Sequence, residues 1–289
     1  MLTPRFTPRA IACLVAGALA LAAGITLHGQ TPWLRGQNVQ PVFEGWERNA
    51  DGSFNMVFGY LNRNHEEQPV IPVGANNFLE PGEADRGQPT HFYPRRQQFV
   101  FKVRVPADWG DEDLVWTVTH NGRTDKAYGS LWPVWEIDRN VMRLNRGSGS
   151  HQGFSDNQAP FVRVDGADAR TVTLPDALEL AVLAGDDGIP PPNPALAKRT
   201  MRPGPKTQAV VDARRAAVTG LAVTWLHYRG GGRVTFDPPV QEVGDDGRAV
   251  TTARFSAPGT YVLQAIADDT VFLTPVDITV TVNPPPSGP

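Results

Sequence analysis

The sequence predicts an all-β protein built from two antiparallel β-sandwich domains. Apolar side chains recur at every second position in several short segments, which places them on one face of a pleated strand. Glycine and proline are abundant, with 28 and 27 residues in a chain of 289, and this suits many turns and few long helices. The length allows two domains of ordinary size.

Residues 1–30 have the order of parts that a Sec-type signal peptide shows. Arg5 and Arg9 form a positive start, and a stretch rich in alanine and leucine runs from Ile11 to Ile25 before polar residues follow. An uncleaved anchor is the alternative, because the stretch has about the shortest length that spans a bilayer. We therefore expect an exported protein of the periplasm, the cell surface or the medium.

The only cysteine, Cys13, lies inside this segment. A lipobox at Ala10–Cys13 is disfavoured, since almost no apolar stretch precedes it. The mature chain would then hold no disulfide, no thiolate metal site and no cysteine nucleophile. It would carry 25 basic and 30 acidic residues without a basic stripe, so nucleic acid is not an expected partner. No second apolar run approaches membrane-spanning length.

Residues 38–138 are expected to form the first sandwich. Alternation predicts strands in residues 54–61, 99–105 and 114–119. The turn formers Asn49-Ala50-Asp51-Gly52 precede the first of these strands, and Asn121-Gly122 follows the last. Strands joined by hairpin turns are therefore expected here.

Residues 139–158 are expected to be a flexible linker, because their Gly/Ser-rich centre has little to bury. The second sandwich is expected at residues 159–284, with a disordered tail at 285–289. Residues 189–219 interrupt it with several prolines and basic residues, which indicates a long exposed loop with a helical turn near residues 208–217. The expected strands of this domain centre on Leu178–Val182, Leu221–His227, Val234–Phe236, Tyr261–Ala265 and Val276–Val282.

The second domain resembles PKD-like and Ig-like modules of secreted bacterial proteins over about 125 residues. The segments that carry the resemblance are Thr171–Pro175, Asp186–Pro190, Val223–Trp225, Gly232–Phe236, Phe255–Leu263 and Val276–Val282. The resemblance implies that Trp225 is the buried central tryptophan and that Tyr261 forms a tyrosine corner. The insertion at residues 189–219 and the three prolines after the acidic turn depart from the family pattern. The first domain resembles one found in uncharacterised secreted bacterial proteins, and no activity follows from that.

Four aspartates are a candidate calcium site. Ig topology would bring the loop after the second strand and the loop after the sixth strand to one end of the sandwich. Carboxylate oxygens are ligands that Ca²⁺ prefers. The favoured alternative is that these side chains bond to the backbone of their own turns. The candidate ligands are Asp186, Asp187, Asp268 and Asp269.

The loop-rich stretch 62–96 is a candidate binding surface for a glycan or a protein partner. Its amides, guanidinium groups and aromatic side chains, expected to be exposed, suit a carbohydrate, a carboxylate or a protein. The favoured alternative is an ordered loop whose amides and arginines satisfy its own backbone. The candidate residues are Asn62, Arg63, Asn64, Asn76, Asn77, His91, Phe92, Tyr93, Arg95 and Arg96.

Catalysis is not expected. The histidines show no HxH or HExxH spacing, and Ser148-Gly149-Ser150-His151 lacks the form of a nucleophile elbow. The leading hypothesis is therefore a non-catalytic secreted or envelope protein that acts in binding or as a structural, adhesive surface component. The alternatives are a carbohydrate-binding protein that uses the surface above, and a hydrolase with an unrecognised site. No cofactor is expected other than the calcium ion.

Overall fold

The computed structural model describes residues 33–145, 156–193 and 219–286. The expected signal peptide at residues 1–30 and the expected helical turn near residues 208–217 lie outside the described residues. From Trp33 onward the chain forms one compact unit. In the part that the structure describes, no helix is both long enough and apolar enough to cross a membrane.

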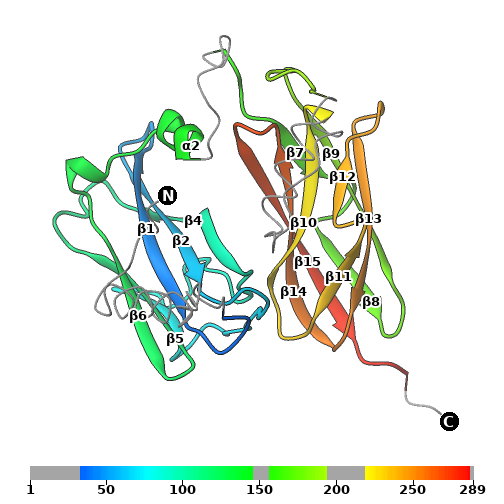
Figure 1. The fold of residues 1–289 in the computed structure, drawn as a ribbon, viewed down its shortest axis with the longest axis horizontal. Helices are drawn as coiled ribbons and strands as arrows, with labels where there is room; N and C mark the ends of the chain where they lie inside the picture. The colour runs from blue at the N-terminus through cyan, green and yellow to red at the C-terminus, as the bar shows by residue number, and fades with distance from the viewer. Residues whose placement is uncertain (1–32, 146–155, 194–218, 287–289) are drawn as a thin grey trace, which may run out of the picture. The chain divides into compact units, whose positions relative to one another are not determined.

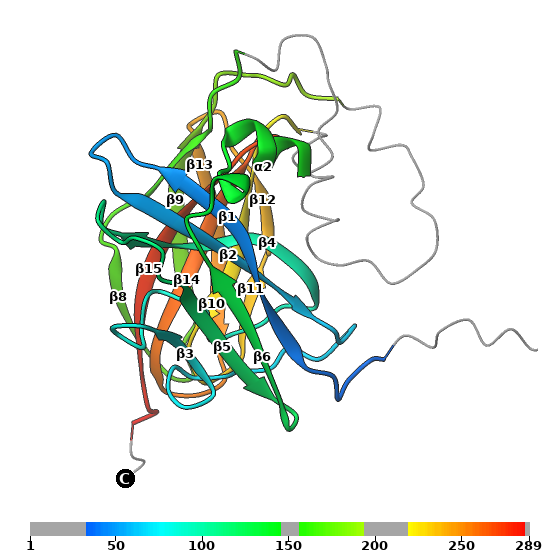
Figure 2. The same cartoon turned by 90° about the vertical axis from the view of Figure 1, so that its left-hand side faces the viewer.

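The first sandwich pairs two three-stranded antiparallel sheets (Figure 1). One sheet has the order β1-β2-β4, and the other has the order β3-β5-β6. In Figure 2 the blue strands β1 and β2 run side by side. The strands are β1 (Val39–Arg48), β2 (Phe54–Asn62), β3 (Asn77–Glu80), β4 (Arg95–Val105), β5 (Leu114–His120) and β6 (Arg123–Gly129).

Turn chemistry and alternation build this sandwich as the sequence predicts. Asn49 donates its backbone N–H to the Ser53 carbonyl at 2.8 Å and closes the β1–β2 hairpin. Phe58 on β2 and Trp116 on β5 are both fully buried, with ring centroids 6.1 Å apart in an edge-on contact. The core therefore lies between the two sheets.

A β-bulge in β1 explains why alternation fails to reveal this strand. The register with β2 shifts between Phe43 and Gly45, so the face on which side chains lie changes partway along. Gly45 has φ +130, and a Cβ there would lie 2.6 Å from both the Ile137 side chain and the Trp135 carbonyl. Only glycine fits this close approach.

The expected linker begins with a helix instead of a flexible segment. A 3₁₀ turn η1 (Pro133–Trp135) and helix α2 (Arg139–Asn145) follow β6. Asp138 caps α2, since its Oδ1 accepts the Val141 N–H at 2.9 Å. The cap and the absence of glycine from residues 139–146 favour a helix at the start of this segment, despite the polar composition that suggested a linker.

The second sandwich packs a five-stranded sheet, β12-β10-β14-β15-β8, against a four-stranded sheet, β11-β13-β9-β7. All pairs are antiparallel except β15 with β8. Figure 1 shows β14 and β15 in orange to red. The strands are β7 (Phe161–Val164), β8 (Ala169–Thr173), β9 (Leu178–Gly185), β10 (Ala222–Arg229), β11 (Val234–Asp237), β12 (Val240–Glu242), β13 (Arg248–Phe255), β14 (Gly259–Asp268) and β15 (Leu273–Asn283).

Two aromatic residues of this sandwich lie where the sequence places them. Trp225 is 2% exposed in the core between the sheets. Tyr261 is 1% exposed, and its hydroxyl donates to the Ala257 carbonyl at 2.7 Å, as a tyrosine corner does. The all-β sandwich fold is confirmed. The domain limits at residues 138 and 159 stay a prediction.

Candidate functional site

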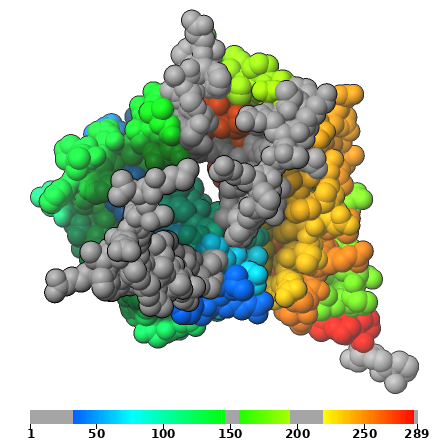
Figure 3. Space-filling view, viewed as in Figure 1, coloured from blue at the N-terminus to red at the C-terminus, as the bar shows by residue number. Residues whose placement is uncertain are grey.

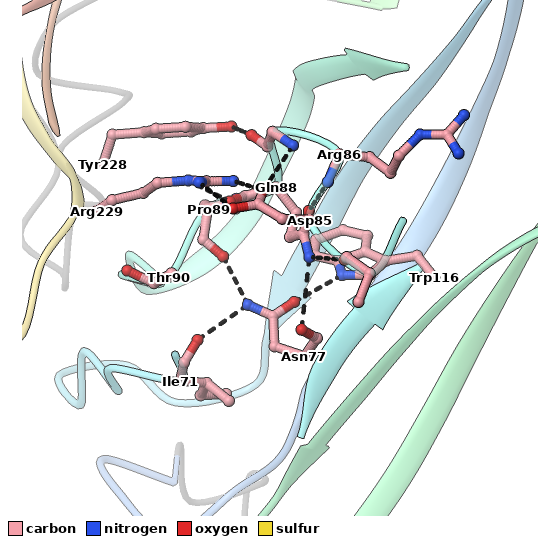
Figure 4. Close-up of polar contacts among 12 residues, drawn as sticks. Ile71, Asn77, Asp85, Arg86, Gln88, Pro89, Thr90, Trp116, Tyr228 and Arg229 are labelled. Atoms are coloured by element: carbon pink, nitrogen blue, oxygen red, sulfur yellow. Dashed lines mark hydrogen bonds and ion pairs between the residues drawn. The ribbon is translucent and has the colours of Figure 1, made fainter. Parts of the chain in front are cut away.

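The predicted binding stretch turns most of its amides inward. Asn77 on β3 is fully buried and holds three partners (Figure 4). Its Nδ2 donates to the carbonyls of Ile71 at 2.9 Å and Pro89 at 2.8 Å, and its Oδ1 accepts the Trp116 indole N–H at 2.9 Å. The side chain therefore ties two loop segments to the core and has no surface to offer a ligand.

Asn62 and Asn64 are placed in the same way. Both are fully buried. Asn62 Nδ2 donates to the carbonyls of Glu67 at 2.7 Å and Phe92 at 3.1 Å. Asn64 Nδ2 donates to the Gln37 carbonyl at 2.9 Å. These bonds match the alternative interpretation, in which the loop amides satisfy the loop backbone.

The expectation of exposed aromatic side chains is wrong for Phe92. It is 0% exposed and packs edge-on against Tyr60, with ring centroids 4.9 Å apart. His91, beside it, is 8% exposed. The physical reason is a bridge between His91 and Val70, which folds the segment back over the core instead of leaving it in solvent.

The arginines of the predicted set do not share one surface. Arg96 clamps the Glu44 carboxylate through Nη2, at 2.7 and 2.8 Å from its two oxygens. Burial raises the pKa of Glu44, and the charge of Arg96 opposes that shift. Arg95 donates to the Arg63 carbonyl at 3.2 Å, and Asn76 is exposed. The structure therefore does not bring the ten candidates together as one patch.

What this stretch does contact is the second sandwich. The amides of Thr90 and His91 both donate to the Tyr228 carbonyl on β10, at 3.1 and 3.2 Å. In return, the His227 amide donates to the Tyr93 hydroxyl at 2.8 Å. Figure 3 shows the cyan surface of the first sandwich meeting the yellow surface of the second. The predicted binding loop is thus a docking segment within the chain.

Two side chains of β10 complete this junction (Figure 4). The Tyr228 hydroxyl donates to the Gly87 carbonyl at 2.5 Å. Arg229 donates to the Gln88 carbonyl at 2.8 Å and grips both Asp85 oxygens, at 3.0 and 2.7 Å. The hydrogen bonding of Arg229 to the Asp85 carboxylate lowers the pKa of Asp85. Two hydrogen bonds between one guanidinium group and one carboxylate fix the relative orientation of Arg229 and Asp85 as well as their distance.

Two histidine rings pack against each other across the junction, tilted by 32°. His91 and His227 have ring centroids 4.4 Å apart, and His227 is 1% exposed. His91 Nε2 lies 3.0 Å from Gln68 Oε1, while His91 Nδ1 and both ring nitrogens of His227 are buried without a hydrogen-bond partner. Burial lowers the pKa of His91 to about 3 and that of His227 to about 4.

Sequence reasoning missed the β10 side of this junction. The alternation along β10 assigns Trp225 and His227 to the core face. One signal was available: the alternation that assigns Trp225 and His227 to the core puts the large aromatic ring of Tyr228 on the opposite, outward face. An aromatic side chain on an outward strand face is typical of a contact surface.

All four candidate calcium ligands accept backbone amides of their own turns, as the alternative interpretation expects, and two of them also keep an oxygen without a partner. Both oxygens of Asp187 bond to backbone amides of Gln158 and Ile189, each at 2.9 Å. Asp268 Oδ1 accepts the Thr270 amide at 2.7 Å. These two serve turns, as the alternative interpretation expects.

Asp186 and Asp269 do come together, beside Asn157. Asp269 is fully buried, and its Oδ2 atom has no hydrogen-bond partner. Asp186 Oδ1 and both polar side-chain atoms of Asn157 are also buried atoms without a hydrogen-bond partner. Burial, opposed by hydrogen bonds and reinforced by the Asp186 charge, raises the pKa of Asp269 to about 6. Orphaned oxygens from three side chains fit a hard cation, which takes further oxygens from water or backbone. Within the described ranges, no group of three or more His, Cys, Asp or Glu is placed to hold a metal ion.

A tryptophan loop at residues 132–135, which the sequence reasoning did not single out, exposes two aromatic side chains at the end of the first sandwich. Trp132, Val134 and Trp135 are 63%, 80% and 46% exposed. The backbone beneath them is fixed, since the Trp132 carbonyl accepts the Trp46 indole N–H at 2.9 Å and the Ile137 amide donates to the Trp46 carbonyl at 2.8 Å. The backbone that carries the two indoles is therefore fixed although the indoles face solvent.

No known protein family model matches this chain, and no curated protein matches it. Among solved structures, the D00–D0 domain of intimin is 9% identical with a TM-score of 0.26, over 84% of this chain and 100% of that one. Domains 4 and 5 of the S-layer protein SbsC are 9% identical with a TM-score of 0.25, over 60% and 66%. The PKD domain of human KIAA0319 is 19% identical with a TM-score of 0.24, over 49% and 97%. The fold class is therefore assigned from the sheet topology of this chain and not from these similarities.

Proposed function

We propose that this chain is a non-catalytic exported protein that acts as a structural or adhesive component outside the cytoplasm, with its two sandwiches held as one unit. The junction between β10 and residues 85–93 carries this proposal. It combines buried backbone hydrogen bonds with the Arg229–Asp85 ion pair. Neighbouring domains ordinarily move relative to each other, so a built junction indicates that their spacing matters.

Spin labels can test whether the junction holds. The exposed Asp111 and Asp245 lie in different sandwiches, and each can be replaced by cysteine in a Cys13→Ser background. We expect one narrow distribution of distances between the labels at pH 7. In a Tyr228→Ala/Arg229→Ala variant, which loses the side-chain contacts at Gly87, Gln88 and Asp85, the distribution should broaden. A broad distribution in the wild-type background would refute a fixed unit.

A second candidate function is carbohydrate binding at the tryptophan loop. Exposed indoles on a fixed backbone are pre-organised for stacking, and little side-chain freedom is lost on binding. Arg48 and Glu136, whose charged atoms lie 3.6 Å apart beside this loop, offer polar partners for hydroxyl groups. This location replaces the one around Tyr93, whose hydroxyl already accepts the His227 amide.

Pull-down on insoluble polysaccharides tests this second candidate. Binding should fall at least tenfold in Trp132→Ala and Trp135→Ala. Trp33→Ala is the matched control, because Trp33 is 67% exposed but lies outside the loop. If all three variants bind equally, or if the wild type retains no polysaccharide, the loop is not a carbohydrate site.

We also propose a Ca²⁺ ion at the end of the second sandwich, held by Asp186, Asp269 and Asn157. Their unpartnered buried oxygens support it. The ion would act structurally, by compensating two carboxylates that burial otherwise penalises.

A further inference from the structure

We propose that the packed pair His91 and His227 makes the junction acid-sensitive, so that the two sandwiches separate in mildly acidic surroundings while each stays folded. This inference rests on the proposed function, because it concerns release of the same junction. It adds a regulatory behaviour that a purely structural unit does not have.

The geometry gives the pair no negative charge to compensate an added proton. The two ring centroids are 4.4 Å apart, one from each sandwich, and both rings are buried. The side chains that touch them are Gln68, Tyr93 and Tyr261, which are all neutral at physiological pH. Neither ring contacts a carboxylate in the described part of the chain. Protonation would therefore bury an uncompensated imidazolium, and a second proton would place two like charges on rings whose centroids are 4.4 Å apart.

The charged groups of the same junction do not offset this. Arg229 and Asp85 neutralise each other, and the lowered pKa of Asp85 keeps that pair charged in mild acid. Asp277 on β15 and these two groups act on the Tyr228 hydroxyl. The Arg229 backbone slightly favours a proton on His227, but burial outweighs it. Opening the junction is thus the way in which both rings can be hydrated and charged.

Linkage sets the direction and the size of the effect. In the closed junction the pKa of His91 is about 3 and that of His227 about 4, against 6.5 for exposed rings. The free energy by which the neutral histidines favour the closed junction is therefore complete above pH 6.5, and it declines as the pH falls below 6.5. At pH 4.5 each histidine raises the opening equilibrium by about 100-fold.

The labelled Asp111→Cys/Asp245→Cys chain measures release directly. We expect a narrow distance distribution at pH 7 and a broad one at pH 4.5, with unchanged far-ultraviolet circular dichroism at both. In a His91→Phe/His227→Phe variant, which keeps two aromatic rings at these positions that cannot be protonated, the distribution should stay narrow at pH 4.5. His65→Gln, in the first sandwich and outside the junction, should behave as the wild type.

The outcomes separate the two proposals. A broad distribution already at pH 7 refutes the fixed unit itself. A narrow distribution at both pH values, or broadening that the double variant shares, refutes the acid release alone, as does loss of the β-sheet signal at pH 4.5. If the double variant does not fold, NMR titration of the histidine C2 protons decides: both rings titrating near pH 6.5 with the junction closed would overturn the inference.

Discussion

At the scale of single residues, two neighbouring asparagines should differ sharply. Asn77→Ala removes three buried hydrogen bonds, to Ile71, Pro89 and Trp116, and leaves their polar groups unsatisfied. We expect a loss of about 3 kcal/mol in the free energy of unfolding, measured in urea. Asn76→Ala, at the exposed adjacent position, should change it by less than about 0.5 kcal/mol. Equal effects would show that the Asn77 network does not stabilise the fold.

The same residues show what the sequence could indicate about the site. It marked the stretch 62–96 as rich in hydrogen-bonding groups, and it offered backbone satisfaction as the alternative to ligand binding. It could not distinguish Asn77 from Asn76, because burial there depends on pairing between Asn77 on β3 and Val118 on β5, far along the chain. Trp132 and Trp135 were equally invisible, since an isolated tryptophan looks the same whether it is buried or exposed.

At the scale of elements, alternation found the strands whose two faces differ in polarity. β2 and β5 were predicted closely, because each packs an apolar face on the core. β1 was missed because its bulge shifts the pattern at Gly45, and β6 because its sequence, Arg123–Gly129, is mostly polar. The turn at Asn49–Gly52 was still recognised, since its chemistry is local.

The loop before β15 and the loop after β9 carry the prediction for calcium. Adding Ca²⁺ to metal-free protein should raise the melting temperature by several degrees, because a ligand that binds only the folded state stabilises it. Asp269→Asn should abolish this rise. Asp176→Asn, an exposed aspartate between β8 and β9, serves as the control and should keep it. No shift with Ca²⁺ in the wild type would remove the ion from the proposal.

At the scale of the whole molecule, the buried histidines and Asp269 set opposing dependences of stability on pH. The folded pKa values of His91 and His227 lie below the ordinary 6.5, so their stabilising effect is complete above that pH and declines as the pH falls toward 4. The folded pKa of Asp269, about 6, lies above its ordinary 3.8, so its stabilising effect is complete below pH 3.8 and is lost as the pH rises through 6.

Counting protons gives the slope. Near pH 5, as long as the junction stays closed, the unfolded chain binds about two protons at the histidines, whereas the folded chain binds about one, at Asp269. The free energy of unfolding in EDTA should therefore rise by about 1.4 kcal/mol per pH unit from these groups. Asp269→Asn removes the opposing proton, so its slope should be about twice as large, because only the two histidines then contribute. Urea titrations of both proteins between pH 5 and 6, above the pH 4.5 at which the junction is expected to be open, measure this, and parallel slopes would mean that Asp269 does not hold its proton in the folded state.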